Sequence, residues 1–240
     1  PLLVMDWADG GSVKEWLQQR PSQRSIKQAL GFGIQVARGL ISLHEILKMV
    51  HQDLKPANVL MYGVLLKIAD FGLSRFFQQD IASMTGQVGT PGWTAPEVFK
   101  FNSYDQKVDV YSFGVLMAEC LSCERPYAGM DAMQVAFATV YRNKRPNLPS
   151  GLPTNLEKLV KLCWDADPKK RPPFAKILDS LRAIERGVTG YDTYASDWRY
   201  LRSSRAVAIA LGDVGLVSVG GNGENTRRLD QSTISPPQRL

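Results

Sequence analysis

The chain has 240 residues, of which 44% are hydrophobic and 22% are charged. This is enough apolar material for a core, and the composition excludes a collagen-like, coiled-coil or wholly disordered chain. The net charge is +6, but 23 acidic residues are interspersed among 29 basic ones, which indicates a mildly basic solvated surface. We therefore expect a mostly globular protein that has no nucleic acid among its partners.

The three cysteines and the longest apolar run near the C-terminus bear on where the protein works. Cys120 and Cys123 form a single C-x-x-C with neither a second pair nor neighbouring histidines, so reduced thiols are favoured over a metal site. The apolar run at 206–219 contains Asp213 and is too short to span a bilayer. These features predict a cytoplasmic protein without a membrane span.

Taken in chain order, the hydrophobic periodicity predicts a mainly helical chain with a few short strands. Strands are predicted at 2–5, 58–61 and 65–68. Longer helices are predicted over 26–47, 108–121, 131–141, 154–163 and 173–184. Ser12 is a suitable N-cap for a short helix through Leu17, and Ser25 with Gln28 forms a capping-box pattern at the start of the next helix.

Three stretches depart from ordinary amphipathic patterning. The helix at 108–121 is almost uniformly apolar around Ser112 and Glu119, which indicates that it is buried at the centre of a helical domain. The polar, glycine-containing segment at 71–96 reads as a long loop, and loops of that length are usually functional. Residues 187–240 carry scattered glycine, serine and arginine and are predicted to be mostly a flexible tail.

Two polar motifs carry the chemistry. The run from His51 to Asn58 (HQDLKPAN) places a carboxylate, an ammonium group and a carboxamide close together, and Asp70-Phe71-Gly72 follows shortly after it. Phosphoryl transfer needs an oriented nucleophile and neutralisation of the charge on the phosphate oxygens. A carboxylate base, a lysine and oxygen ligands for a metal ion are suited to those tasks, and these loops supply all of them.

The order and spacing of these motifs resemble the eukaryotic protein kinase family. The resemblance continues through the segments 95–97 (APE), 109–114 (DVYSFG), 163–164 (CW) and 171–172 (RP). It covers residues 2 to about 186 and implies a kinase domain over 1–186, followed by the tail at 187–240. The implied fold is the mainly α-helical large lobe of a kinase, with short β-hairpins at the catalytic and metal loops, a remnant hinge strand and a disordered C-terminal tail.

The resemblance implies a role for each residue that matches the family's catalytic motifs. Asp53 would orient the substrate hydroxyl and accept its proton. Lys55 would steady the γ-phosphate, and Thr90 would pack its hydroxyl against the Asp53 and Lys55 pair. Asn58 and Asp70 would hold the magnesium ions.

The resemblance also implies a nucleotide site, with ATP and Mg²⁺ as the cofactors. Met5 would be the gatekeeper, the backbone from Asp6 to Ala8 would be the hinge that binds the adenine edge, and Leu60 would form the floor under the adenine. A further set would be structural: Asp109 would brace the catalytic loop, and Glu97 would pair with Arg171.

Several features narrow the expected class within the family. A lysine two positions after Asp53 and a threonine at position 90 resemble serine/threonine kinases. The Trp93-Thr94-Ala95 run and the helix containing Asp109 resemble the tyrosine-kinase-like group. His44 and His51 are interpreted as structural histidines rather than ligands.

Two departures from the family pattern qualify this expectation. Gln52 stands where the family usually has an arginine that grips a phosphorylated activation loop, so phosphorylation of Ser83 or Thr85 is predicted to matter less here. In addition, no Gly-rich loop with a strand lysine precedes the first strand, and the glycines at 31–33 and 220–223 do not supply one. The chain therefore reads as a large lobe without its small lobe.

Two functions of different classes remain open from the sequence. The first is a protein serine/threonine kinase that transfers phosphate from Mg-ATP to protein substrates, with an upstream kinase or scaffold as a further partner. A chain without the small lobe is expected to turn over very slowly or not at all. The alternative is a non-catalytic kinase-like lobe that acts as a protein-binding module.

Overall fold

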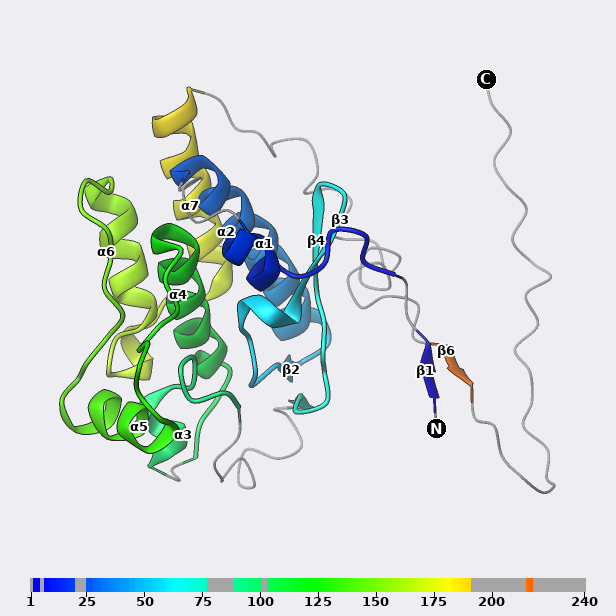
Figure 1. The fold of residues 1–240 in the computed structure, drawn as a ribbon, viewed down its shortest axis with the longest axis horizontal. Helices are drawn as coiled ribbons and strands as arrows, with labels where there is room; N and C mark the ends of the chain where they lie inside the picture. Colours follow the sequence, from blue (N-terminus) through cyan, green and yellow to red (C-terminus); the bar gives the residue numbers. More distant parts are fainter. Residues whose placement is uncertain are drawn as a thin grey trace. The chain divides into compact units, whose positions relative to one another are not determined.

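The computed structural model describes residues 2–4, 7–19, 25–76, 89–100, 103–190 and 215–217 (Figure 1). The chain divides into two units, Pro1–Met5 with Val214–Leu240 and Asp6–Asp213, and each is described by itself. The larger unit carries the helices and the catalytic motifs.

The larger unit is mainly α-helical, as predicted. Its α-helices are α1 (Val13–Gln19), α2 (Ile26–Ile41), α3 (Pro96–Phe99), α4 (Lys107–Ser122), α5 (Ala132–Tyr141), α6 (Thr154–Cys163) and α7 (Phe174–Thr189). The described part of this unit also contains the short non-α helices η1 (Ser42–Ile46), η2 (Pro56–Asn58) and η3 (Pro168–Lys170). Within the described ranges, no helix is both long and apolar enough to cross a membrane.

Side-chain caps explain where several helices begin. At α1 the Ser12 hydroxyl accepts from the Glu15 amide at 3.3 Å, and the Glu15 carboxylate accepts from the Ser12 amide at 2.7 Å. Asp131 and Gln134 form the same reciprocal capping box at α5. Ser25 caps α2 by accepting from the Gln28 amide, as its sequence pattern predicts.

The helix predicted over 26–47 has an irregular end. Regular α2 stops at Ile41, and the π-helix η1 follows with a hydrogen bond from the Leu47 amide to the Ser42 carbonyl at 3.1 Å. This wider turn contains the buried His44, which contacts a carboxylate on α4. Hydrophobic spacing cannot reveal such a tertiary contact, so it did not indicate the change of helix type.

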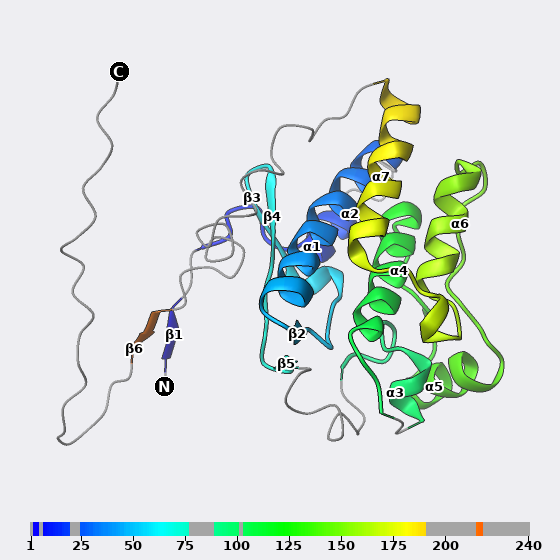
Figure 2. The ribbon, with the colours of Figure 1, turned by 180° about the vertical axis from the view of Figure 1, so that it is seen from behind.

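Helix α4 lies at the centre of the helical unit, and α2, α6 and α7 surround it (Figures 1 and 2). Every residue from Val108 to Ser122 is buried, which confirms the prediction of a central helix. Close approach to α6 depends on Gly114, where a Cβ atom would lie 3.0 Å from that of Cys163. The core is therefore built around a helix with no solvent-exposed face.

Short antiparallel strand pairs flank the catalytic loops. Strand β3 (Val59–Tyr62) pairs with β4 (Leu65–Ile68) in the register Val59 to Ile68 and Tyr62 to Leu65. The turn between them includes Gly63 at a φ of +56°. Strand β2 (Met49–Val50) pairs with β5 (Arg75–Phe76). The β3–β4 pair is a hairpin as predicted, whereas β2 and β5 are not consecutive strands and pair across the segment that contains the catalytic and metal loops.

The segment before α1 is tied to β3. The Gly10 amide donates to the Met61 carbonyl at 3.1 Å, and the Met61 amide donates to the Gly11 carbonyl at 2.9 Å. Ser12 also forms an antiparallel bridge with Leu60. These bonds fix the residues that follow the predicted hinge against the strand that follows the catalytic loop.

Two described elements fall within the segment predicted as a tail. Helix α7 continues to Thr189 and ends at Gly190, which has a φ of +80° suited to a helix C-cap. In the smaller unit, β1 (Leu2–Val4) pairs antiparallel with β6 (Gly215–Val217). The first strand is present as predicted, and its partner is a strand that the composition of the tail did not indicate.

Candidate active site

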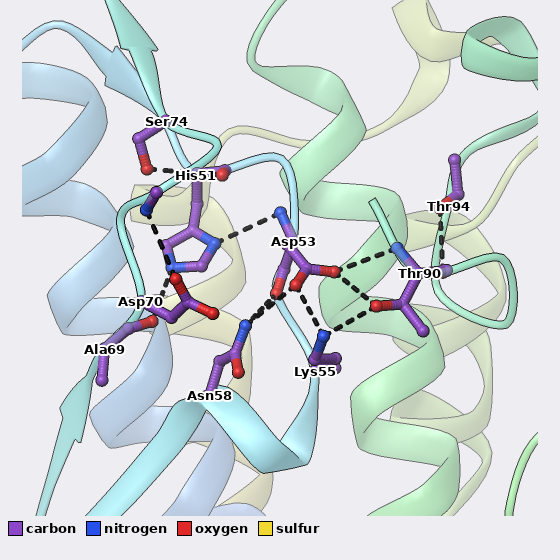
Figure 3. Close-up of polar contacts among 10 residues, drawn as sticks. His51, Asp53, Lys55, Asn58, Ala69, Asp70, Ser74, Thr90 and Thr94 are labelled. Carbon is purple, nitrogen blue, oxygen red and sulfur yellow. Dashed lines mark hydrogen bonds and ion pairs between the residues drawn. The ribbon is translucent and has the colours of Figure 1, made fainter. Parts of the chain in front are cut away.

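The Asp53 carboxylate is the centre of a compact hydrogen-bonded cluster (Figure 3). One oxygen accepts from Lys55 Nζ at 2.6 Å and from Asn58 Nδ2 at 3.1 Å. The other accepts from the Thr90 amide at 3.0 Å and from the Thr90 hydroxyl at 2.7 Å. Lys55 Nζ also donates to the Thr90 hydroxyl at 2.7 Å. Three of the other four predicted catalytic residues therefore bond directly to Asp53.

The local backbone explains how these side chains meet. Lys55 precedes the single 3₁₀ turn of η2, and Pro56 at its first position has no amide hydrogen to leave unpaired. The turn brings Asn58 back toward Asp53, so that its amide nitrogen also donates to the Asp53 carbonyl at 2.9 Å. Three polar residues of one short loop are thus held in a fixed arrangement.

Thr90 reaches the cluster because of the glycine before it. Gly89 has a φ of +98°, and a Cβ atom there would lie only 2.6 Å from the Gln52 carbonyl oxygen. A larger residue could not approach the catalytic loop so closely. The Thr90 carbonyl is held in turn by the Thr94 hydroxyl at 2.8 Å.

Asp70 and Asn58 provide oxygen atoms that suit a magnesium ion. The Ala69 amide bonds to the Asn58 carbonyl at 2.9 Å, which brings the two loops together. The Asn58 amide nitrogen faces Asp53, so its oxygen has no hydrogen-bond donor among the described residues. Exposed Asp70 has a φ of +64°, and the one bond that its side chain accepts from the described residues is a long one of 3.4 Å from the Gly72 amide. These oxygens are the hard ligands that Mg²⁺ prefers.

The described residues contain no cluster of three or more histidine, cysteine or acidic side chains that could hold a metal ion. Magnesium often keeps several water ligands and is bound through one or two carboxylates plus substrate phosphates. The pair formed by Asn58 and Asp70 fits that pattern and does not suit a zinc site.

His51 joins the two loops structurally. Its Nε2 lies 3.0 Å from the Ala69 carbonyl, so that nitrogen carries the hydrogen, and its Nδ1 accepts from the Asp53 amide at 3.3 Å. The ring also packs edge-on against Phe71, with the ring centres 5.2 Å apart. Both ring nitrogens are occupied by protein groups, in agreement with a structural role.

Asp109, at the start of α4, is fully buried beneath the catalytic loop. Its carboxylate accepts from the backbone amides of His51 at 2.8 Å and Gln52 at 2.9 Å, and it lies 2.8 Å from His44 Nε2. Burial by itself would raise the pKa of Asp109, but the His44 contact and the neighbouring backbone donors outweigh it and lower the pKa. Asp109 thus braces the loop as an ionised carboxylate.

A second buried pair holds the segment that ends in Glu97. The Arg171 guanidinium donates to both carboxylate oxygens of Glu97, at 2.5 and 2.9 Å. It also donates to the carbonyls of Asp165 at 2.9 Å and Lys107 at 3.0 Å. This is a bidentate pair with additional main-chain partners, which is the arrangement a buried charge requires.

The predicted nucleotide residues are only partly within the described chain. Leu60 is half-buried in β3. Ala8 begins a turn in which its carbonyl accepts from the Gly11 amide at 3.2 Å. Met5 and Asp6 lie outside the residues whose side chains are described. The roles assigned to these four residues stay predictions.

Gln52 makes a buried side-chain contact that the sequence did not predict. It has a φ of +71°, and its amide nitrogen donates to the Tyr104 hydroxyl at 2.9 Å. Its side-chain oxygen is buried without a hydrogen-bond partner among the described residues. Ser83 and Thr85 lie outside the described residues, so the predicted effect of their phosphorylation stays a prediction.

The two polar exceptions on α4 also contact the segment before α3. Ser112 donates to the Trp93 carbonyl at 2.8 Å, and the buried Glu119 accepts from the Trp93 indole at 3.2 Å. Burial raises the pKa of Glu119 to about 7. In the sequence these two positions stand out as polar breaks in an apolar run, and that pattern is the signal that could have indicated their contacts with Trp93.

Comparison with known proteins gives one consistent result. The model of the family "protein tyrosine and serine/threonine kinase" matches residues 1–181. A probable serine/threonine-protein kinase of Dictyostelium discoideum is 35% identical over 182 residues, which are 75% of this chain and 20% of that protein. Serine/threonine-protein kinase STY17 of Arabidopsis thaliana is 34% identical over 187 residues, covering 78% of this chain and 32% of its own length.

Serine/threonine/tyrosine-protein kinase HT1 of Arabidopsis thaliana is 35% identical over 188 residues, covering 78% of this chain and 48% of its own length. The chain therefore spans less than half the length of each of these three relatives. The family match includes the catalytic loop, the metal loop and the central helix described above. The chain belongs to the protein kinase family.

Proposed function

We propose that this chain carries the phosphoryl-transfer residues of a protein serine/threonine kinase. The observation that best supports this function is the cluster in which the Asp53 carboxylate accepts from Lys55, Asn58 and Thr90. Asp53 accepts the proton of the substrate hydroxyl and orients its oxygen toward the phosphate. Lys55 places a positive charge at the γ-phosphate and steadies it during transfer.

ATP and Mg²⁺ are the proposed cofactors. Asn58 and Asp70 hold the metal through their side-chain oxygens, and bound magnesium neutralises charge on the phosphates. Leu60 and the hinge around Ala8, with Met5 and Asp6, bind the adenine. Thr90 keeps Asp53 and Lys55 together, because its hydroxyl donates to the first and accepts from the second.

The decisive experiment measures transfer of labelled γ-phosphate from Mg-ATP to a protein acceptor such as casein, using the intact protein that contains this chain. Asp53→Asn should lower the rate about 10²- to 10⁴-fold, as expected for loss of a general base. Lys158→Gln, at an exposed site on α6, is the matched control and should not change the rate. Label should appear on serine or threonine.

Two results would contradict the proposal. Equal rates in the Asp53→Asn variant and the parent would remove Asp53 from the mechanism, and label on tyrosine alone would contradict the serine/threonine assignment. A folded intact protein that transfers no phosphate would instead favour a binding module.

We also propose that the protein is cytoplasmic and acts on protein substrates. The location is supported by the three cysteines, all within the described residues and none in a disulfide. Burial raises the pKa of Cys120 and of Cys163, the latter to about 12, which keeps both thiols protonated and unreactive.

A further inference from the structure

A cavity of about 340 Å³ lies beside the catalytic cluster. Its lining includes Lys55 and Thr90, both bonded to Asp53, together with Trp93 and Glu119. A group bound in this cavity is therefore close to the position at which a substrate hydroxyl meets Asp53. The charges of its lining indicate what it binds.

The cavity has two cations that the catalytic cluster does not use. Lys14 on α1 and Arg125 after α4 line it, and both side chains are exposed. Neither forms an ion pair with any described residue at 4 Å or less. Their acidic sequence neighbours, Glu15 and Glu124, do not line the cavity, and Glu15 is engaged in capping α1. The acidic group of the cavity that both cations act on is Glu119, where burial raises the pKa and the charges of Arg125 and Lys14 offset part of that rise.

The only carboxylate among the described residues that line this cavity is Glu119. It is 8% exposed and accepts from the Trp93 indole, so it is poorly placed to bind a ligand cation. Burial also raises its pKa to about 7, so near neutral pH it carries only part of a charge. The third cation, Lys55, is already paired with Asp53. The unbalanced charge of the cavity is therefore positive.

We infer that this cavity is a substrate subsite for an anionic side chain, a carboxylate or a phosphate, in the same peptide that presents its hydroxyl to Asp53. Lys14 and Arg125 bind the anion and thereby set substrate preference. The inference rests on the proposed kinase function, because that function places a peptide next to Asp53. Exposed ion pairs act mainly on specificity, so the expected effect on affinity is modest.

The test uses fluorescence anisotropy to measure peptide binding to the whole chain, which requires no phosphate transfer. The probes are labelled serine peptides in which glutamate, phosphoserine, glutamine or lysine is placed in turn at each position near the serine. At one or more positions the glutamate and phosphoserine peptides should bind about threefold to tenfold more tightly than the glutamine peptide. Salt should weaken that preference.

Variants then assign the preference to the two cations. Lys14→Gln and Arg125→Gln should each reduce it, and the double variant should abolish it. Lys158→Gln removes an exposed lysine that does not line the cavity and should leave the preference unchanged. Circular dichroism of each variant checks that the helical unit is folded.

Three outcomes would overturn the inference. These are the absence of any preference for anionic peptides, persistence of the preference in the double variant, and tighter binding of lysine peptides that is lost in Glu119→Gln. Failure of the kinase proposal would appear separately, as an intact protein that transfers no phosphate while the charge preference persists in binding.

Discussion

Asp109 and Asp53 are both buried carboxylates that organise the same loop, but their partners are of different kinds. Asp109 is fully buried and is held by two backbone amides and His44. Asp53 accepts most of its bonds from the side chains of Lys55, Asn58 and Thr90. Backbone donors fix a shape, whereas side-chain donors can exchange partners when a substrate arrives. Asp109 is therefore a charge that maintains the shape of the loop, whereas Asp53 is a charge that can take part in chemistry.

The largest effect on stability is expected where a buried ionised side chain loses its ion-pair partner. Arg171 is 1% exposed, and Arg171→Met would leave the Glu97 carboxylate uncompensated. We expect a loss of about 3–5 kcal/mol in the free energy of unfolding, measured by urea denaturation. Replacing both residues, with Glu97→Gln added, should recover part of the loss. A loss below about 1 kcal/mol would show that the pair of Arg171 and Glu97 does not stabilise the fold as a buried ion pair.

The next effect depends on pH and concerns Glu119. Burial raises its pKa from 4.5 to about 7, so the folded protein holds this proton more tightly than the unfolded chain does. The parent therefore loses stability as pH rises from about 4.5 to 7, by an amount on the order of 3 kcal/mol. Glu119→Gln should remove this loss, so the variant should be more stable than the parent above pH 7.

Below pH 4.5 the parent and the Glu119→Gln variant should be equally stable, because the carboxyl group is then protonated in both folded and unfolded states. Urea denaturation at several pH values measures the difference. A constant difference across the range would mean that folding does not change the pKa of Glu119.

Asp53→Asn should have a smaller effect on stability despite its large expected effect on activity. The asparagine oxygen can still accept from Thr90, and Lys55, with a side chain 21% exposed, can turn to solvent. The free energy of unfolding should fall by about 1 kcal/mol or less in urea denaturation. A loss as large as that of Arg171→Met would show that Asp53 stabilises the fold as strongly as the buried Arg171–Glu97 pair does.

The smallest effect is expected for an exposed pair on α6. Lys161 lies 2.5 Å from Glu157, and the two side chains are 60% and 41% exposed. Lys161→Gln should change the free energy of unfolding by about 0.3–0.5 kcal/mol, and salt should reduce the difference. This variant provides the baseline against which the buried charges are measured in the same denaturation assay.

Much of the fold was accessible from local patterns in the sequence. The buried helix α4 was predicted because its residues are apolar on every side, and the β3–β4 hairpin followed from short apolar runs around Tyr62-Gly63. Capping patterns located the starts of α1 and α2. These signals work because they arise from neighbours within a few residues along the chain.

Other features depend on contacts between distant residues. The π-helix at Ser42–Ile46 accompanies a contact between His44 and Asp109, and the pairing of β1 with β6 joins opposite ends of the sequence. The cavity lined by Lys14 and Arg125 brings together residues far apart along the chain. No local periodicity encodes such proximity, so sequence analysis could not anticipate them.

The catalytic motifs specified the residue types and their order, because phosphate chemistry demands a base, a cation and metal ligands at close spacing along two loops. The folded chain added their mutual distances, the partners of Asp109, and the raised pKa of Glu119. Those properties come from burial and from the approach of α1, α4 and the segment before α3. Such an environment exists only once the helices have packed.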